Sequence, residues 1–135
     1  MALKVDLLGP VGAGSESGPV EIGGVRLRML LARLALEGGR PVSADGLVDG
    51  LWGEQPPADA SNALQALVSR LRKSLRGHAA VESVGGGYRL DVTEADVDVH
   101  RFEQLAGAGR RALAAGRGAE AALKLGAALA LWRGP

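Results

Sequence analysis

The sequence predicts an α+β fold followed by a helical segment, because its hydrophobic periodicity changes along the chain. Apolar residues alternate with polar ones near the start and again over residues 81–92, which is the period of a half-buried strand. Between these regions, and again after residue 99, apolar residues recur every three or four positions, as on one face of a helix. The expected order is a small sheet, three helices, a β-hairpin and a pair of helices.

The chain is expected to open with a small antiparallel sheet. Apolar and charged residues alternate over residues 3–7, which predicts the first strand. The Gly, Pro and Ser content of residues 9–18 predicts a loop, and short extended pieces at 20–22 and at Val25 are expected to complete the sheet.

The first helix is predicted by five apolar residues that share one face at helical spacing. They are Leu27, Leu30, Leu31, Leu34 and Ala35. Gly38 and Gly39 offer the left-handed conformation that ends many helices, and Pro41 prevents continuation.

The second helix is short and is expected to begin at a capping serine. Ser43 can accept a hydrogen bond from a free backbone N–H, and Asp45 in the first turn interacts favourably with the helix dipole. Gly53 and two following prolines end the helix after Trp52. Its apolar stripe consists of Leu47, Val48, Leu51 and Trp52.

The third helix is expected from Asp59, its cap, to about Arg76, and it carries the strongest functional signal. Its inward row is Leu64, Val68, Leu71 and Leu75. Its opposite stripe consists of Asn62, Gln65, Ser69, Arg72, Lys73 and Arg76, with Arg70 beside it. Residues 62–78 contain four basic residues and no acidic one, although the net charge of the chain is only +1. Amides can bind adenine edges, arginine can bind guanine, and the cations can neutralise phosphates. The alternative is an ordinary solvated helix face.

A hairpin follows the third helix. Residues 81–84 form its first strand, and Tyr88, Leu90 and Val92 form the inward face of the second strand, after a turn of three glycines. Arg89 then points away from the core, where it could enter a minor groove or simply face solvent. A short capped helix, a basic helix and a glycine-tipped hairpin in this order predict a winged helix-turn-helix over residues 1–93.

The remaining residues, 94–135, are alanine-rich and predict a helical hairpin that resembles a tetratricopeptide (TPR) unit. One helix is expected to about residue 115 and a second from 119 to 132, with a break at 116–118. Such a unit cannot bury its apolar face alone, since arrays need about three units. Either the helical domain is truncated, or the hairpin packs on the first domain.

Several other functions are not supported by the sequence. The segment 9–15 imitates a phosphate loop, but Ser15 stands where the lysine would be required. His78 and His100 lack metal-ligand spacing, and no nucleophile pairs with a base, so we expect no catalytic site, metal or cofactor, and no enzyme. Trp52 and Trp132 are expected in the core. With no cysteine, signal peptide or membrane-spanning run, a cytoplasmic protein that does not bind membranes is expected.

Motifs along essentially the whole chain resemble one family of regulators. They are RMLL at 28–31, GRPVS at 39–43, LVDGLWG at 47–53, NALQ at 62–65, VSRLRK at 68–73, GYRL at 87–90, VDVHRF at 97–102 and LWRGP at 131–135. In this order and spacing they are similar to the Streptomyces antibiotic regulatory protein (SARP) family, whose winged helix is of the OmpR/PhoB type. The arginine preference and the high Ala and Gly content also suggest a GC-rich actinomycete genome.

The resemblance implies a transcriptional activator of antibiotic or other secondary-metabolite gene clusters. Its implied partners are double-stranded DNA with direct repeats in promoters and RNA polymerase holoenzyme, and a homodimer on DNA is compatible with it. It places the DNA-binding helix on 62–76 and the wing arginine on Arg89. The sequence departs from the family pattern at Ala66 and Leu67. Polar residues are expected at these two positions, so base contacts there would be lost. A different class of function, a protein-interaction module that uses its winged helix to dimerise or to dock a partner, remains as the alternative.

Overall fold

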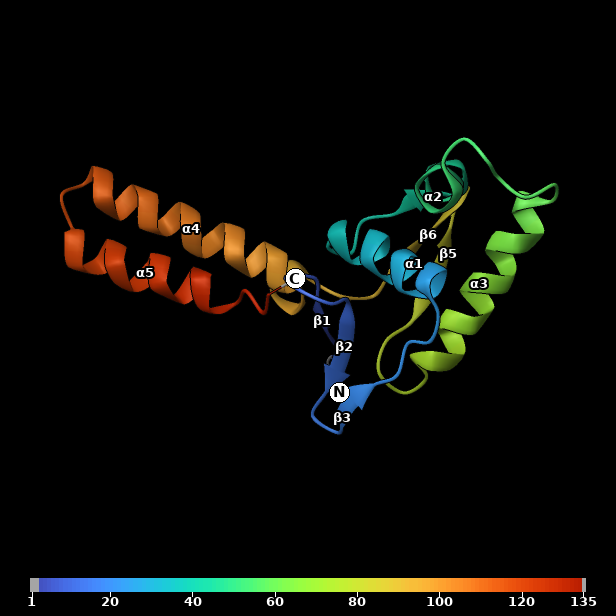
Figure 1. Cartoon of the computed structure of the whole chain (residues 1–135), viewed down its shortest axis with the longest axis horizontal. Helices are drawn as coiled ribbons and strands as arrows, with labels where there is room; N and C mark the ends of the chain where they lie inside the picture. Colours follow the sequence, from blue (N-terminus) through green and yellow to red (C-terminus); the bar gives the residue numbers. More distant parts are fainter. Residues whose placement is uncertain (1–2, 135) are drawn as a thin grey trace.

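The computed structural model describes residues 3–134. Residues 1 and 2 of the first expected domain and residue 135 of the second lie outside this range. The α+β class, with an N-terminal antiparallel sheet and a C-terminal hairpin, is confirmed (Figure 1). The strands are β1 (Lys4–Asp6), β2 (Gly12–Ser15), β3 (Gly18–Val20), β4 (Val42–Ser43), β5 (Val81–Val84) and β6 (Gly87–Leu90). The helices are α1 (Val25–Leu36), α2 (Ala44–Trp52), α3 (Ala60–Ser74), α4 (Asp98–Ala114) and α5 (Gly118–Ala130), with a 3-10 turn at Glu94–Asp96.

The N-terminal sheet differs from the expectation in three places, of which one is its third strand, which is 18–20 and not 20–22. The segment predicted to be a loop contains the central strand, since β2 pairs antiparallel with both β1 and β3. Its sequence, Gly-Ala-Gly-Ser, has one apolar side chain, Ala13, which is buried, so the strand is specified by backbone pairing and not by periodicity. Val25 is not extended but opens α1, because Gly24, with φ 95°, turns the chain and its carbonyl accepts the N–H of Arg28 at 3.1 Å.

The core lies between α1, α2, α3 and the β5–β6 hairpin, and the predicted apolar faces are confirmed. All five residues of the α1 face are buried, at most 3% exposed. Leu47 of α2 and Leu90 of β6 are fully buried, and both meet the inward row of α3 in one cluster. This cluster supports α3 from behind and leaves its other face outside the core.

The second helix begins as expected, at Ser43. The Ser43 Oγ accepts a hydrogen bond from the backbone N–H of Gly46 at 3.0 Å. Asp59 caps α3 in the same way, accepting from the backbone N–H of Asn62 at 3.1 Å. Gly38 and Gly39, with φ of 60° and 100°, turn the chain after α1 and so place Ser43 at the start of α2.

We expect Ser43→Ala to lower the free energy of unfolding by about 1 kcal/mol, because one N–H of the first turn of α2 loses its acceptor. Urea titration should show a lower midpoint with an unchanged slope. Ser69→Ala is the matched control, since Ser69 is exposed in the middle of α3 and should change stability by less than about 0.5 kcal/mol. An equal loss in both variants would contradict the capping role.

The second sheet has the order β4-β6-β5 and is antiparallel throughout. Gly87 lies opposite Ser43 of β4 on one side and Val84 of β5 on the other. A Cβ at Gly87 would lie 2.0 Å from the carbonyl oxygen of Val42 and 2.8 Å from the Cα of Ser43. The strands approach so closely at this point that only glycine fits.

Helices α4 and α5 form a hairpin that projects away from the rest of the molecule (Figure 1). Ala112, Ala121 and Ala128 are buried between them, and Gly109 allows close approach of Leu125. The expectation that Trp132 lies in the core is wrong: it follows α5 and is 58% exposed. Trp132 is exposed because, within residues 3–134, α5 packs chiefly on α4 alone.

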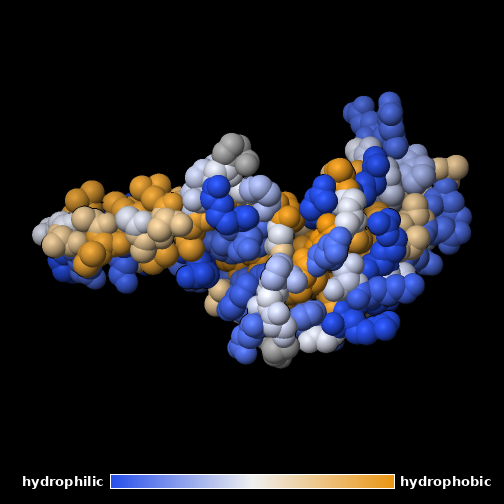
Figure 2. Space-filling model, turned by 60° about the horizontal axis from the view of Figure 1, so that its bottom comes forward, coloured by the Kyte–Doolittle hydropathy of each residue, from blue (hydrophilic) through white to orange (hydrophobic). Residues whose placement is uncertain are grey.

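The outer surface of this hairpin is strongly apolar. Figure 2 shows hydrophobic residues over much of it, and Leu113, Leu123 and Leu129 are each more than 60% exposed. This agrees with the expectation that a single helical pair cannot bury its apolar face.

The helical hairpin is attached to the N-terminal sheet at both of its ends. At its start, the carboxylate of Asp98, which is 6% exposed, accepts the backbone N–H groups of Leu7 at 2.7 Å and Leu8 at 2.9 Å. At its end, the backbone N–H of Arg133 donates to the Leu8 carbonyl at 2.9 Å, and the Arg133 guanidinium donates to the Pro10 carbonyl at 2.6 Å. The connection between the two parts is therefore a bonded junction.

An ion pair adds to this junction. Lys4 Nζ lies 2.9 Å from Asp96 Oδ1. Burial disfavours the charged form of Asp96, but hydrogen bonds from the Thr93 backbone and from Lys4 outweigh it and hold the pKa of Asp96 below its ordinary value. Among the described residues, no helix combines the length and the apolar character needed to cross a bilayer.

Candidate nucleic-acid interface

Helix α3 lies at the edge of the molecule opposite the α4–α5 hairpin (Figure 1). Its predicted inward row is confirmed, since Leu64, Val68, Leu71 and Leu75 are at most 2% exposed. Its predicted outer stripe is exposed at every position: Asn62, Gln65, Ser69, Arg70, Arg72, Lys73 and Arg76. The final two helices do not cover this face, so a large ligand has access to it.

The two positions that depart from the family pattern differ in location. Leu67 is 8% exposed and belongs to the core cluster, so its apolar side chain is accounted for by packing. Ala66 is exposed and offers no polar group. Only Ala66 therefore leaves a gap in the polar face.

Four side chains of the outer stripe are free to bind a ligand. Within residues 3–134, Gln65, Ser69, Lys73 and Arg76 make no side-chain hydrogen bond or ion pair. An amide and a hydroxyl that offer donors and acceptors stand here beside two cations. Such a surface can bind base edges and phosphates simultaneously.

Two further residues of the stripe already have partners in the fold. The Asn62 Nδ2 donates to Asp59 Oδ2 at 2.7 Å, so its amide is tied to the cap of α3. The Arg70 Nη2 donates to the Gly23 carbonyl at 3.4 Å and lies beside the start of α1. Each must give up or share this contact to bind a base or a phosphate.

Arg72 reaches across from α3 to the β5–β6 hairpin, which we call the wing. Its Nε donates to the Val81 carbonyl at 2.9 Å, and its Nη2 donates to Ser83 Oγ at 3.2 Å. Its guanidinium carbon also lies 5.9 Å from the centre of the Tyr88 ring, a cation–π distance.

Arg89 stands apart from this cluster. In the register of the wing, Ser83 is opposite Tyr88 and Glu82 is opposite Arg89, so Tyr88 faces α3 and Arg89 lies on the other face. The Arg89 Nη2 lies 3.0 Å from Glu82 Oε1 and 3.4 Å from Asp91 Oδ1, and its side chain is 28% exposed. The structure brings the α3 residues together but does not bring Arg89 to them.

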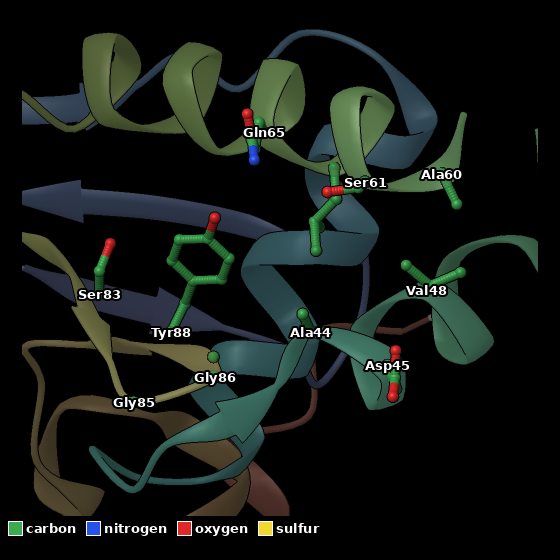
Figure 3. A pocket seen from close by; sticks show the side chains of 12 residues that line it. Ala44, Asp45, Val48, Ala60, Ser61, Gln65, Ser83, Gly85, Gly86 and Tyr88 are labelled. Atoms are coloured by element: carbon green, nitrogen blue, oxygen red, sulfur yellow. The ribbon is translucent and has the colours of Figure 1, made fainter.

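A groove of about 410 Å³ separates α3 from the tip of the wing. It is also lined by the start of α2, including Asp45, the acidic group on its rim. Figure 3 shows Ser61 and Gln65 of α3 on one side and Tyr88 and Ser83 of the wing on the other, with the Tyr88 hydroxyl directed towards α3.

Sequence reasoning missed Ser61 and the Tyr88 hydroxyl as groove residues. The alternation that assigned Tyr88 to the core side was right about its direction, but the residue is only half-buried. Its polar end is therefore available in the groove. The sequence signal for this was the residue type, since tyrosine combines an apolar ring with a terminal hydroxyl.

The two histidines lie away from the α3 face. His100 Nε2 is 3.3 Å from the Ala35 carbonyl, and His78 Nδ1 is buried with no partner among the described residues. No group of three or more His, Cys, Asp or Glu side chains in residues 3–134 could hold a metal ion.

Two family models match the chain in succession. Residues 24–90 match the model described as "Transcriptional regulatory protein, C terminal", and residues 97–135 match the "Bacterial transcriptional activator domain". The first covers α1 to β6, which includes α3 and the wing, and the second covers the helical hairpin.

Curated relatives match 98% of the chain. The transcriptional regulatory protein EmbR of Mycobacterium tuberculosis is 38% identical, the transcriptional regulator RedD of Streptomyces coelicolor 39%, and the regulatory protein DnrI of Streptomyces peucetius 34%. The chain spans 36%, 40% and 52% of their respective lengths, so it corresponds to only part of each relative.

A solved structure of EmbR from Mycobacterium tuberculosis, in complex with a low-affinity phosphopeptide, superimposes with a TM-score of 0.89. It is 38% identical, and the match covers 98% of this chain and 36% of that one. No enzyme family appears among these matches. The two domain models in this order, together with these relatives, show that the chain belongs to the SARP family of transcriptional regulators.

Proposed function

We propose that the chain binds promoter DNA through α3 and activates transcription, in an actinomycete, of a gene cluster for an antibiotic or another secondary metabolite. The observation that carries this proposal is the exposed face of α3, where free amide, hydroxyl and cationic groups stand on a helix backed by four buried residues. A helix of this width fits the major groove of B-DNA.

The residues of α3 divide into two roles. Gln65, Ser69 and, after release from its cap, Asn62 read base edges, because amides and hydroxyls can donate and accept. Lys73 and Arg76 bind phosphates and position the helix without reading sequence. Arg70 binds DNA after its hydrogen bond to the Gly23 carbonyl is broken.

Arg89, on the wing, reaches a minor groove only after its ion pairs with Glu82 and Asp91 are broken.

The regulatory role extends beyond α3. The binding sites are direct repeats, occupied by separate copies or by a homodimer, and activation proceeds through contact with RNA polymerase holoenzyme. The support for these steps is membership of the SARP family, the match to a bacterial transcriptional activator domain and the similarity to relatives that are transcriptional regulators. None of these steps requires a cofactor.

Selection of duplexes from a random pool tests this function directly. We expect the retained fragments to share a repeated half-site with both copies in the same orientation. We also expect the affinity for any duplex to fall steeply with salt, because phosphate contacts release counterions. Binding that is weak, independent of salt and without sequence preference would favour the protein-interaction module.

Gln65→Ala separates base reading from phosphate binding. We expect it to cost about 1 to 3 kcal/mol at the selected site and nothing on a random duplex, since the amide contacts a base and not the backbone. Fluorescence anisotropy on both duplexes measures the difference. Gln104→Ala, an exposed glutamine on α4, is the matched control and should change neither affinity. Equal loss on both duplexes would contradict the assignment.

A further inference from the structure

Arg72 differs from Lys73 and Arg76 of α3 because its charged end is occupied by the fold. Its Nε and Nη2 donate to the backbone of Val81 and the hydroxyl of Ser83, both on β5. Its guanidinium carbon lies 5.9 Å from the centre of the Tyr88 ring on β6. One side chain from α3 therefore contacts both strands of the wing.

The wing depends on few other attachments near its tip. Val81 and Leu90, at its base, are at most 5% exposed, but residues 82–86 are all exposed. On the side away from α3, the tip is held by β4 and the start of α2, where the Ala44 N–H donates to the Gly86 carbonyl at 2.9 Å. Arg72 provides the corresponding hold from the α3 side.

We propose that Arg72 is a positioning residue that sets the width of the groove between α3 and the wing, and that it is not a phosphate ligand. The directions of its N–H groups favour this role, because a guanidinium has donors in a fixed fork and two of them are already satisfied inside the protein. Lys73, the next residue, has the same charge and no partner among the described residues, so it is the phosphate ligand of the pair. That Arg72 is not a phosphate ligand rests on the proposed function, whereas its role in positioning the wing does not.

The experiment measures two quantities in the same variants. Amide hydrogen exchange of residues 81–90 in the free protein reports opening of the wing. The dependence of affinity on salt for a labelled duplex of random sequence reports the number of phosphates bound. The variants are Arg72→Ala, Arg72→Lys, Ser83→Ala and, as matched control, Lys73→Ala.

We expect Arg72→Ala to speed exchange in the wing about tenfold, because hydrogen bonds from a charged donor are lost, and to leave the salt slope unchanged. Arg72→Lys should also speed exchange, since an ammonium cannot reproduce the fork although the charge is kept. Ser83→Ala should give a smaller increase. Lys73→Ala should leave exchange unchanged and lower the slope by about one.

The proposal is overturned if Arg72→Ala lowers the salt slope as Lys73→Ala does, or if wing exchange is unchanged in both Arg72 variants. Should Arg72→Ala fail to fold, Arg72→Gln takes its place in the salt measurement because it also removes the charge, and Arg72→Lys and Ser83→Ala still decide through wing exchange. If the unaltered chain binds no duplex even at low salt, the proposed function fails, and wing exchange alone then decides whether Arg72 positions the wing.

Discussion

Replacing both Lys73 and Arg76 with alanine is expected to weaken binding to any duplex by about sixtyfold at 0.1 M salt. Each cation that neutralises a phosphate adds about 0.9 to the slope of log affinity against log salt, so the loss of two lowers the slope by about 1.8. Both side chains are exposed and have no partner within residues 3–134, so their removal leaves the fold intact. Anisotropy titrations over a range of salt concentrations measure both quantities.

The matched control removes two cations from another helix. Arg101 and Arg110 are exposed on α4, and their replacement by alanine changes the net charge of the chain by the same amount. We expect this variant to keep nearly all of the salt slope. If the two double variants lost affinity equally, binding would depend on overall charge and the α3 face would not be the interface.

Gly87→Ala is expected to lower the free energy of unfolding by about 3 kcal/mol, at the upper end of the usual cost of overpacking. The new Cβ would lie 2.0 Å from the Val42 carbonyl oxygen, and backbone atoms cannot move aside as the end of a flexible side chain can. The pairing between β4 and β6 must therefore open. Because β4 ends at Ser43, the start of α2 loses its anchor as well. Urea unfolding followed by tryptophan fluorescence measures the loss.

Gly86→Ala is the control for this effect. Gly86 precedes Gly87 at the tip of the wing, but a Cβ there would meet no atom within 4 Å. It should change the free energy of unfolding by less than about 0.5 kcal/mol. Similar losses in both variants would mean that the cost comes from glycine flexibility in the turn and not from the close approach of β4.

Residues that act through packing could be predicted from the sequence. The inward row of α3 and the five apolar residues of α1 are buried as expected, because helical spacing alone decides which side chains share a face. The caps at Ser43 and Asp59 were also predictable, since a capping side chain bonds to a backbone N–H only two or three residues away.

Residues that act through contacts distant in sequence could not be predicted in the same way. The partners of Arg70 and Arg89 include carbonyls 47 and 50 residues away, which no local pattern indicates. The cations of the α3 stripe therefore look alike in the sequence, although they differ in what they already bind. Strand β2 was missed for the same reason, because its hydrogen-bond partners and not its own side chains define it.

The hydrogen bonds of Asp98 and Arg133 hold the α4–α5 hairpin against the N-terminal part of the chain. Because Asp98 and Arg133 both bond to residues 7–10, a duplex bound on α3 and a partner bound on α4–α5 would be carried by one hydrogen-bonded framework. Loss of these hydrogen bonds would let the two bound molecules reorient independently of each other.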